Sequence, residues 1–469
     1  MQFRRNPLTI GHILFLVVLS GRLAAAQTTP PAPQVFTLER AIGYAMDHYP
    51  SVRAALEQTQ AAHGGVGLAQ TSYLPSANTL WQSNRASFNN IFGQLLPQSV
   101  VPPISGPVLA NTSNRSAWGS AAGVLLSWEP FDFGYRRATV NVARAGERAA
   151  RSQADLTRLD VAGASAGAFF SLLAAEQVTR AAQANLRRWD VFDQSVRVLV
   201  DNQLRPGADA SRADAELAVA RTQLIQAETS ENVGRAAFVD ILGLPGTSVE
   251  IDAGSLLGPP PEASLAALPV SAHPAATAQQ AQVDEVKAQE FALERSYVPR
   301  IFTEAALSGR GSGANLDGTD AGGLNGLGLE RMNYAAGIIV TFPLFDYFSI
   351  RAEKKIAAAD QRAQEAHYDQ TLQDLSEQVQ QAQATLDGAR RIAQNTPIEL
   401  EAARASEIQA RARYQAGLAT VVEVAESEGL LVQAEIDDAL ARLNVWRGLE
   451  GVAEAQGSLQ PFVQLLSGR

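Results

Sequence analysis

Residues that could do acid–base, nucleophilic or metal chemistry are sparse in this sequence and do not cluster. The chain of 469 residues has no cysteine, which excludes disulfides, thiolate metal ligands and a cysteine nucleophile. Its five histidines stand in unrelated contexts, without the short spacings of a metal site; they are His12, His48, His63, His273 and His367. We therefore expect no catalytic residue, no metal and no cofactor, and we expect that the chain is not an enzyme.

Phosphate and nucleic acid are equally poor candidates as ligands. The stretch GRGSG at residues 309–313 has the composition of a phosphate-binding loop. Such a loop stands between a strand and a helix, but here no strand is expected to lead into it and no helix to follow, so we interpret it as part of a long loop. The net charge is −10 with lysine and arginine scattered, which argues against a nucleic-acid partner.

The first 26 residues have the pattern of a secretory signal. Arg4 and Arg5 precede a short apolar run at residues 13–19, and Ala24 and Ala26 then occupy the small-residue positions of a cleavage site. No cysteine follows that could carry a lipid. We also expect no later segment with the roughly 18 consecutive apolar residues of a membrane helix. The sequence therefore predicts an exported protein without a helical membrane span.

The mature sequence repeats one plan twice. PFDFGYRR at residues 130–137 is echoed by PLFDYFSIR at 343–351, and the Tyr-Leu-Pro at 73–75 by Tyr-Val-Pro at 297–299. Each copy is expected to contain a helix, a strand, a loop, a strand, a long helix, a tight turn and a helix. The expected domains are a signal (1–26), a first repeat (27–256), a proline- and alanine-rich linker (257–274), a second repeat (275–456) and a C-terminal tail (457–469).

The expected helices are long and carry narrow apolar seams. In the first copy a helical pattern runs through residues 133–201, roughly 100 Å at 1.5 Å per residue. Two shorter helices, at 38–72 and 209–242, together have the same length, which predicts a rod with two short helices end to end beside one long helix. In the second copy the long helix is expected at 348–414, with apolar residues spaced by three and four as in an antiparallel coiled coil.

Four strands are expected, at residues 74–88, 118–128, 299–308 and 333–342, and two of them have an apolar face with an aromatic residue at each end. These aromatic residues are Trp118 and Trp128 in one strand and Tyr334 and Phe342 in the other. Ten residues of strand tilted near 40° span about 25 Å, the height of the apolar band of an outer-membrane barrel. A strand in the core of a soluble sandwich is the alternative. Four strands cannot close a barrel, so the chain is expected to oligomerise, with eight strands in a dimer or twelve in a trimer.

Over essentially its whole mature length the sequence resembles the TolC-type outer-membrane efflux protein family. The resemblance rests on the two-fold repeat, the Tyr-x-Pro strand entries, the Phe-Asp strand exits and the glycine-centred turns between helices. It implies a mainly α-helical protomer that contributes to a trimeric β-barrel and an α-helical tunnel. It also implies an exit duct in the Gram-negative outer membrane with a long periplasmic extension, working with a periplasmic adaptor and an inner-membrane transporter in drug efflux or type I secretion.

The same resemblance assigns roles to residues at the two turns. YQAGLATVVEVAE is similar to the family's closing motif, which places Glu423 and Glu426 as acidic gate residues beside Tyr414. A solvated acidic helix face is the alternative interpretation. Gly207, Asp209, Asp214 and Gly417 are expected at the turns and at the adaptor contact, with positive φ at both glycines; Ala419 stands where some relatives have a basic latch. The rival functions are a periplasmic coiled-coil adaptor and a structural envelope protein without a channel.

Overall fold

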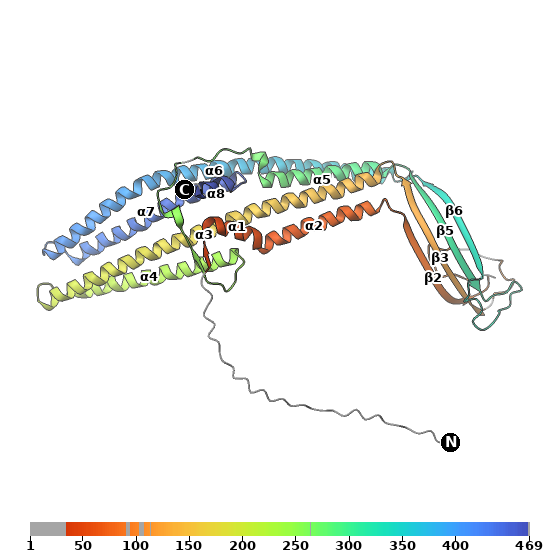
Figure 1. The fold of residues 1–469 in the computed structure, drawn as a ribbon, viewed down its shortest axis with the longest axis horizontal. Coiled ribbons are helices and arrows are strands. Elements are labelled where there is room, and N and C mark those ends of the chain that lie inside the picture. Colours follow the sequence, from red (N-terminus) through yellow and green to blue (C-terminus); the bar gives the residue numbers. More distant parts are fainter. Residues whose placement is uncertain (1–33, 91–93, 103–106, 113, 263, 468–469) are drawn as a thin grey trace, which may run out of the picture.

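The computed structural model describes residues 34–90, 94–102, 107–112, 114–262 and 264–467. The expected signal at residues 1–26, with His12, lies outside the described residues. The chain forms a long body of helices that ends in a four-stranded sheet (Figure 1).

Eight helices and six strands are assigned within the described residues. The helices are α1 (Leu38–His48), α2 (Pro50–Thr71), α3 (Tyr135–Asp201), α4 (Gly207–Ile241), α5 (Pro274–Ser296), α6 (Tyr347–Gln415), α7 (Val421–Ala455) and α8 (Gln460–Ser467). The strands are β1 (Gln34–Phe36), β2 (Ser76–Ser87), β3 (Ser116–Phe131), β4 (Val249–Ile251), β5 (Arg300–Ser312) and β6 (Arg331–Thr341). Two short 3₁₀ turns, η1 (Gly254–Leu257) and η2 (Val270–Ala272), lie between β4 and α5.

The long helices α3 and α6 run the length of the helical body, and the shorter helices are stacked beside them. Helix α3 packs against α2 and α4, while α5 and α7 lie between α3 and α6 (Figure 1). With 67 and 69 residues, α3 and α6 are each roughly 100 Å long. The expected arrangement of two short helices end to end beside a long one is therefore present in both halves of the chain.

The prediction of one continuous helix at residues 38–72 is wrong, because the segment forms two helices, α1 and α2, that are separated at Tyr49 and Pro50. Proline has no N–H for the helical ladder and forces the preceding residue out of the helical region. Tyr49 accordingly has φ −65° and ψ 133°. The break allows α1 to turn away from α2 and bury Leu38, Ile42 and Ala45 in the core.

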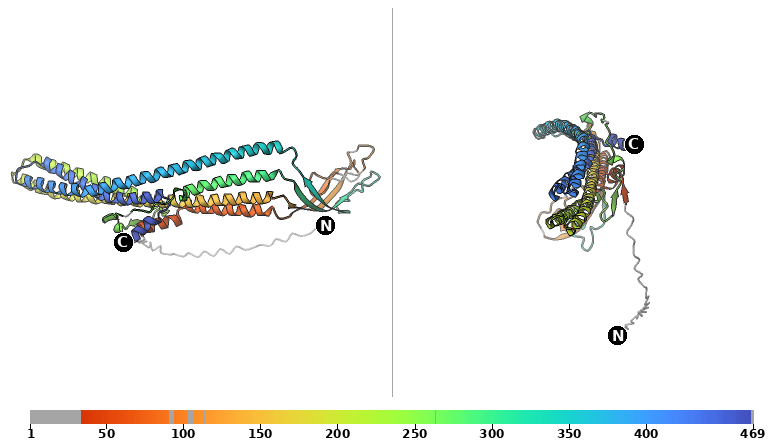
Figure 2. Two further views of the ribbon diagram at one scale, coloured as in Figure 1. Left: turned by 90° about the horizontal axis from the view of Figure 1, so that it is seen from above. Right: turned by 90° about the vertical axis from the view of Figure 1, so that its left-hand side faces the viewer.

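The main core lies at the level where the short helices meet end to end. It joins α1, α3, α7, α8 and the small parallel sheet β1–β4, and its largest fully buried side chains include Phe169, Phe170, Trp446 and Phe462. In Figure 2 (right), α8 and the C-terminus lie on the convex side of the curved helical layer. The segment interpreted as a C-terminal tail thus contains a helix that packs on this outer face.

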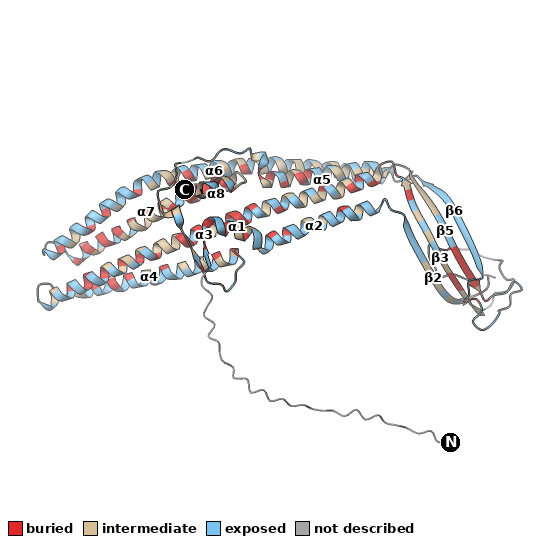
Figure 3. Cartoon of the chain, viewed as in Figure 1, coloured by how far each residue is buried: buried red, intermediate tan, exposed pale blue. Residues whose placement is uncertain are grey.

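The coiled-coil seam expected on the second long helix is present. Leu375, Leu386 and Ala389 of α6 are buried, and Ala382 and Ala393 pack against the core. Figure 3 shows buried residues in narrow stripes along the helices. The two helices approach closely at Gly448 of α7, where an added Cβ would lie 3.0 Å from Leu386 Cα.

Helix α3 also corrects an expectation about membrane helices. By length and composition it is long and apolar enough to cross a membrane, contrary to the expectation that no later segment would be. Half of its most apolar window is buried inside the protein. Phe169, Phe170, Leu172 and Leu173 of this helix are fully buried in the core, so packing accounts for its apolar character.

The sheet has the order β2-β3-β5-β6, with every neighbouring pair antiparallel, and β2 and β6 are its two edges. All four strands occur where the sequence predicts them. The interpretation of the GRGSG stretch as part of a loop is wrong, because residues 309–312 belong to β5 and pair with β3. Its glycines permit close packing: a Cβ on Gly311 would lie 1.7 Å from the carbonyl oxygen of Gly328 in the following loop.

One face of this sheet exposes large apolar side chains. Register partners point to the same side of a sheet, and Val124, Leu307 and Tyr334 are level with one another on three neighbouring strands. The exposed apolar residues of this face are Trp81, Val124, Leu126, Trp128, Leu307, Met332, Tyr334, Ile338 and Val340. Trp81 was not singled out from the sequence, because β2 alternates poorly.

Strand β3 enters helix α3 through a connection of three residues, 132–134. Two of them, Phe133 and Gly134, have positive φ of 50° and 96°, so the chain turns sharply within this short connection. Asp132 Oδ1 accepts the Gly134 N–H at 3.1 Å, and its other oxygen accepts Arg136 Nε at 2.9 Å. Arg136 in turn donates to the carbonyl of Ser72 at 3.2 Å. The Phe-Asp exit of the sequence is thus the joint that holds the strand at a fixed angle to the helix.

Candidate functional site at the helix tips

The end of the molecule far from the sheet consists of two helical hairpins (Figure 1). The first tip joins α3 to α4 at residues 202–206, and the second joins α6 to α7 at residues 416–420. Gly417 has φ +79°, as expected for a turn glycine. Gly207 does not, because it is the first residue of α4 after Pro206, and the left-handed residue of the first tip is Gln203 with φ 58°.

The second tip is stabilised by a capping box that the sequence contains but that was not recognised from it. Thr420 Oγ1 accepts the backbone N–H of Glu423 at 3.4 Å, and Glu423 Oε1 accepts that of Thr420 at 3.3 Å. Glu423 also pairs with Arg413 Nη1 at 3.4 Å. One of the two predicted gate acids therefore holds the turn, while Glu426 is exposed on α7.

Tyr414, near the C-terminal end of α6, connects the two tips. Its side chain is 1% exposed, and its hydroxyl donates to Asp209 Oδ2 at 3.0 Å. Arg205 lies 4.3 Å above the Tyr414 ring and donates to its backbone carbonyl. Burial, together with the hydrogen bond to Asp209, raises the pKa of Tyr414 to about 12. The phenol therefore keeps its proton at neutral pH and remains a donor.

An apolar cluster, here called the tip cluster, lies behind this hydrogen bond. It contains residues from all four tip helices: Trp189, Phe192, Val196, Ala213, Leu217, Ala220, Tyr414, Ala419, Val421 and Val424. Ala419 is buried in it. The two hairpins are therefore held together by apolar contact as well as by the Tyr414–Asp209 bond.

Further from the tips, a set of charged side chains joins the same helices. Glu428 of α7 is 1% exposed and accepts Arg188 Nε of α3 at 2.9 Å, and it also pairs with Arg411 of α6. Arg188 reaches Glu435 at 3.2 Å, and Arg411 reaches Glu407 at 2.6 Å. Burial raises the pKa of Glu428 although both arginines act to lower it. We call these five side chains the charged clamp; no local pattern in the sequence indicates it.

The remaining predicted tip residue, Asp214, faces back toward α3. It pairs with Arg197, which also binds Asp193 through Nε at 2.8 Å. Asp214 is thus separate from the Tyr414–Asp209 contact. Within the described parts of the chain, no group of three or more histidine, cysteine, aspartate or glutamate side chains could hold a metal ion.

The four predicted girdle aromatics lie at the other end of the molecule. Trp128 is 46% exposed and donates through Nε1 to the carbonyl of Tyr73 at 3.1 Å. Phe342 follows β6 and packs against Tyr297. Tyr334 is 88% exposed and level with Val124, six residues along β3 from Trp118. The tip residues and the girdle residues thus form two separate sites, one at each end of the helical body.

Comparison with known proteins places these features in context. Residues 41–244 and 271–458 match the model of the outer membrane efflux protein family. The chain is 26% identical over 410 residues to protein CyaE of Bordetella pertussis, covering 85% of this chain and 80% of that protein. It is 24% identical over 349 residues to the pyoverdine export outer membrane protein OpmQ of Pseudomonas aeruginosa, covering 72% and 71%. A crystal structure of CusC superposes with a TM-score of 0.74 at 15% identity over 90% of this chain and 92% of that chain.

Proposed function

Because the chain belongs to the outer membrane efflux protein family and serves as an outer-membrane exit duct, we propose that three copies form the duct and that the helix tips close it. In this proposal an inner-membrane transporter and a periplasmic adaptor deliver the substrate. The sheet crosses the outer membrane of a Gram-negative cell, the helices extend through the periplasm, and residues 1–26 are removed on export.

The open sheet supports oligomerisation. Among the described residues, no strand pairs with the outer edge of β2 or β6, and an unpaired edge is not tolerated in lipid. Two copies would give eight strands, a barrel whose interior is filled by side chains, whereas three give twelve and leave a lumen. A duct needs the lumen, which favours the trimer. The exposed apolar face of the sheet, with Trp81, Trp128, Tyr334 and Phe342, would then face lipid.

The Tyr414–Asp209 hydrogen bond is the observation that supports the gate most directly. It joins residues 205 positions apart and holds the α6–α7 tip against the α3–α4 tip. Any outward movement of one hairpin relative to the other must break it. The charged clamp also joins the two hairpins, because Arg188 of α3 pairs with Glu428 of α7. We therefore assign the closed state to this arrangement.

The acidic gate and the adaptor contact are further parts of the proposal. Three copies of exposed Glu426, with Glu423 nearby, would form rings of like charge that attract cations at the closed end. The exposed turns carrying Gly207 and Gly417 would meet the adaptor, with Asp209 and Asp214 near that contact.

Planar-bilayer recording of the purified protein tests the duct and its gate together. We expect heat-modifiable trimers of low conductance. We expect a larger conductance when Glu423→Ala and Glu426→Ala are combined, because the capping box and the Glu423–Arg413 ion pair that hold the second tip are then lost. A detergent-independent monomer, or a protein without conductance in the wild type and in the double variant, would contradict the proposal.

A further inference from the structure

A cavity of about 720 Å³ lies between α6 and α7, at the level where α7 ends and α5 begins. Helix α7 has two opposite sides here. Trp446, Leu449 and Val452 pack into the core that α1 and α8 cover on the convex face. Asn444, Gly451 and the other cavity-lining residues of α7 occupy the opposite side of the helical turn. The cavity therefore opens on the concave face, which lines the interior of the duct in the proposed trimer.

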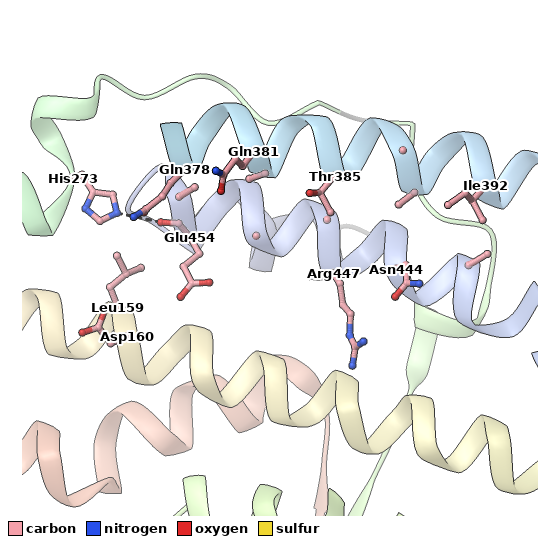
Figure 4. Close-up of a pocket in the computed structure, with 17 residues that line it drawn as sticks. Leu159, Asp160, His273, Gln378, Gln381, Thr385, Ile392, Asn444, Arg447 and Glu454 are labelled. Carbon is pink, nitrogen blue, oxygen red and sulfur yellow. Dashed lines mark hydrogen bonds between the residues drawn. The ribbon is translucent and has the colours of Figure 1, made fainter. Parts of the chain in front are cut away.

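Acidic side chains gather at one end of this cavity. Figure 4 shows Asp160 of α3 and Glu454 of α7 there, with His273 beside them. Within the described part of the chain, neither carboxylate takes part in an ion pair or a side-chain hydrogen bond. The Glu454 carboxylate lies against Gly163, where an added Cβ would be 2.2 Å from Oε1. A larger residue at position 163 would displace that carboxylate.

Glu450 lies one turn before Glu454 on α7 and is a third carboxyl group near this end, although it does not line the cavity. It is 7% exposed, and its Oε1 has no hydrogen-bond partner. Burial raises the pKa of Glu450 to about 8, with a further contribution from Glu454, and burial likewise raises the pKa of Glu454 and Asp160. Arg447 is the nearby cation, but it points toward α3, where it donates to Ser171 Oγ at 3.1 Å (Figure 4).

His273 does not supply a compensating positive charge. Its Nδ1 accepts the Ala275 N–H at 3.0 Å, so the neutral ring carries its proton on Nε2, which is 3.3 Å from the Glu454 carbonyl oxygen. Burial lowers the pKa of His273. Among the described residues, the carboxyl groups of Asp160 and Glu454 therefore have no ion-pair partner at this end, because Arg447 is turned toward Ser171.

The side chains along the rest of the cavity suit the uncharged part of a ligand. Gln378, Gln381 and Asn444 offer amide groups, and Ala382, Ala389 and Ile392 offer apolar surface. A volume of this size lies in the range of pockets that hold drug-sized molecules. A divalent metal fits less well, because it requires a shell of several oxygen ligands and no metal-binding group of side chains occurs among the described residues.

We propose that this cavity binds organic cations that have an apolar body, such as protonated aromatic amines, as they pass along the duct. The amine would lie between Asp160 and Glu454, and the apolar body would rest along α6. This role in transit rests on the proposed function, whereas binding to the cavity can be measured without transport.

The test is the binding of ethidium to the purified full-length protein in lipid nanodiscs, followed by fluorescence, with anionic fluorescein and Mg²⁺ alone as comparison probes. Glu454→Gln keeps the shape and removes the charge, so Kd should rise about ten-fold, as for a lost charge-assisted hydrogen bond. Gly388→Leu fills the cavity, because Gly388 has no atom within 4 Å of an added Cβ, and should abolish binding. The melting temperature of Gly388→Leu should not fall, since leucine has a higher helix propensity than glycine. The matched control is Glu399→Gln, an exposed acid on α6 outside the cavity, which should bind as the wild type does.

Unchanged ethidium affinity in both Glu454→Gln and Gly388→Leu would overturn the proposal, as would fluorescein binding as tightly as ethidium or Mg²⁺ binding in its place. Conductance and oligomeric state are measured on the same samples. A conducting trimer that does not bind ethidium would overturn this inference alone. A protein that binds ethidium but neither trimerises nor conducts would overturn the proposed duct and confirm the site.

Discussion

Replacing Tyr414 by phenylalanine tests the closed state at a single atom. The phenylalanine ring keeps its place in the tip cluster and its stacking under Arg205, whose bond to the backbone carbonyl of residue 414 is also retained. Only the hydroxyl, which donates to Asp209 at 3.0 Å, is lost. Because Tyr414 is 1% exposed, water does not readily replace this donor.

A hydrogen bond to a charged acceptor contributes about 1.5–3 kcal/mol. If the hairpins separate on opening, the open state never contains this bond, so its loss acts on the closed state alone. A change of 1.4 kcal/mol is a factor of ten, so the open-to-closed ratio should rise by roughly ten-fold to a hundred-fold in each protomer. Asp209 is only half-buried, which favours the lower figure.

Single-channel recording in planar bilayers gives this ratio from the fraction of time that the channel is open. Tyr368→Phe is the matched control, since it makes the same change on the same helix at a half-exposed residue whose hydroxyl has no hydrogen bond among the described residues. An open fraction that is the same in Tyr414→Phe and wild type, or that rises equally in Tyr368→Phe, would refute the assignment of this bond to the closed state.

Three further substitutions test the packing of the helical body by thermal unfolding. The pKa of Glu450 is raised to about 8 in the folded protein, so the stability that its protonated form contributes is fully present below about pH 4.5 and is lost as pH rises to 8. Between pH 5 and 8 the free energy of unfolding of Glu450→Gln should therefore fall by a few kcal/mol less than that of the wild type. Equal falls in the two proteins would contradict the burial of Glu450. Arg188→Ala removes one cation from the charged clamp and should cost about 2–3 kcal/mol, whereas Arg187→Ala, on the exposed neighbour, should cost less than about 0.5 kcal/mol. Gly448→Ala should destabilise by about 1–2 kcal/mol because the added Cβ would meet the α6 backbone at 3.0 Å. Gly429→Ala on the same helix meets nothing within 4 Å and should stabilise by up to about 1 kcal/mol, so the opposite order would refute the close helix contact.

Features with a local cause were accessible from the sequence. Alternation predicts the strands, because every second side chain of a strand faces the same side, and β3 and β6 occur where it places them. The seam of α6 and the turn at Gly417 follow from equally local signals. Pro50 was such a signal and was passed over, although a proline there dictates the break between α1 and α2.

The sites depend on contacts that no local pattern encodes. Tyr414 and Asp209 are 205 residues apart, and Arg188 and Glu428 are 240 residues apart. Whether such pairs meet depends on the rotation and axial offset of one helix against another, and an offset of one residue turns a side chain by about 100°. The sequence alone therefore determined the elements, their duplicated order and the family they resemble. Only the packed structure decided that Tyr414 is buried against the other hairpin, that Glu423 caps its own helix, and that Asp160 and Glu454 meet beside His273.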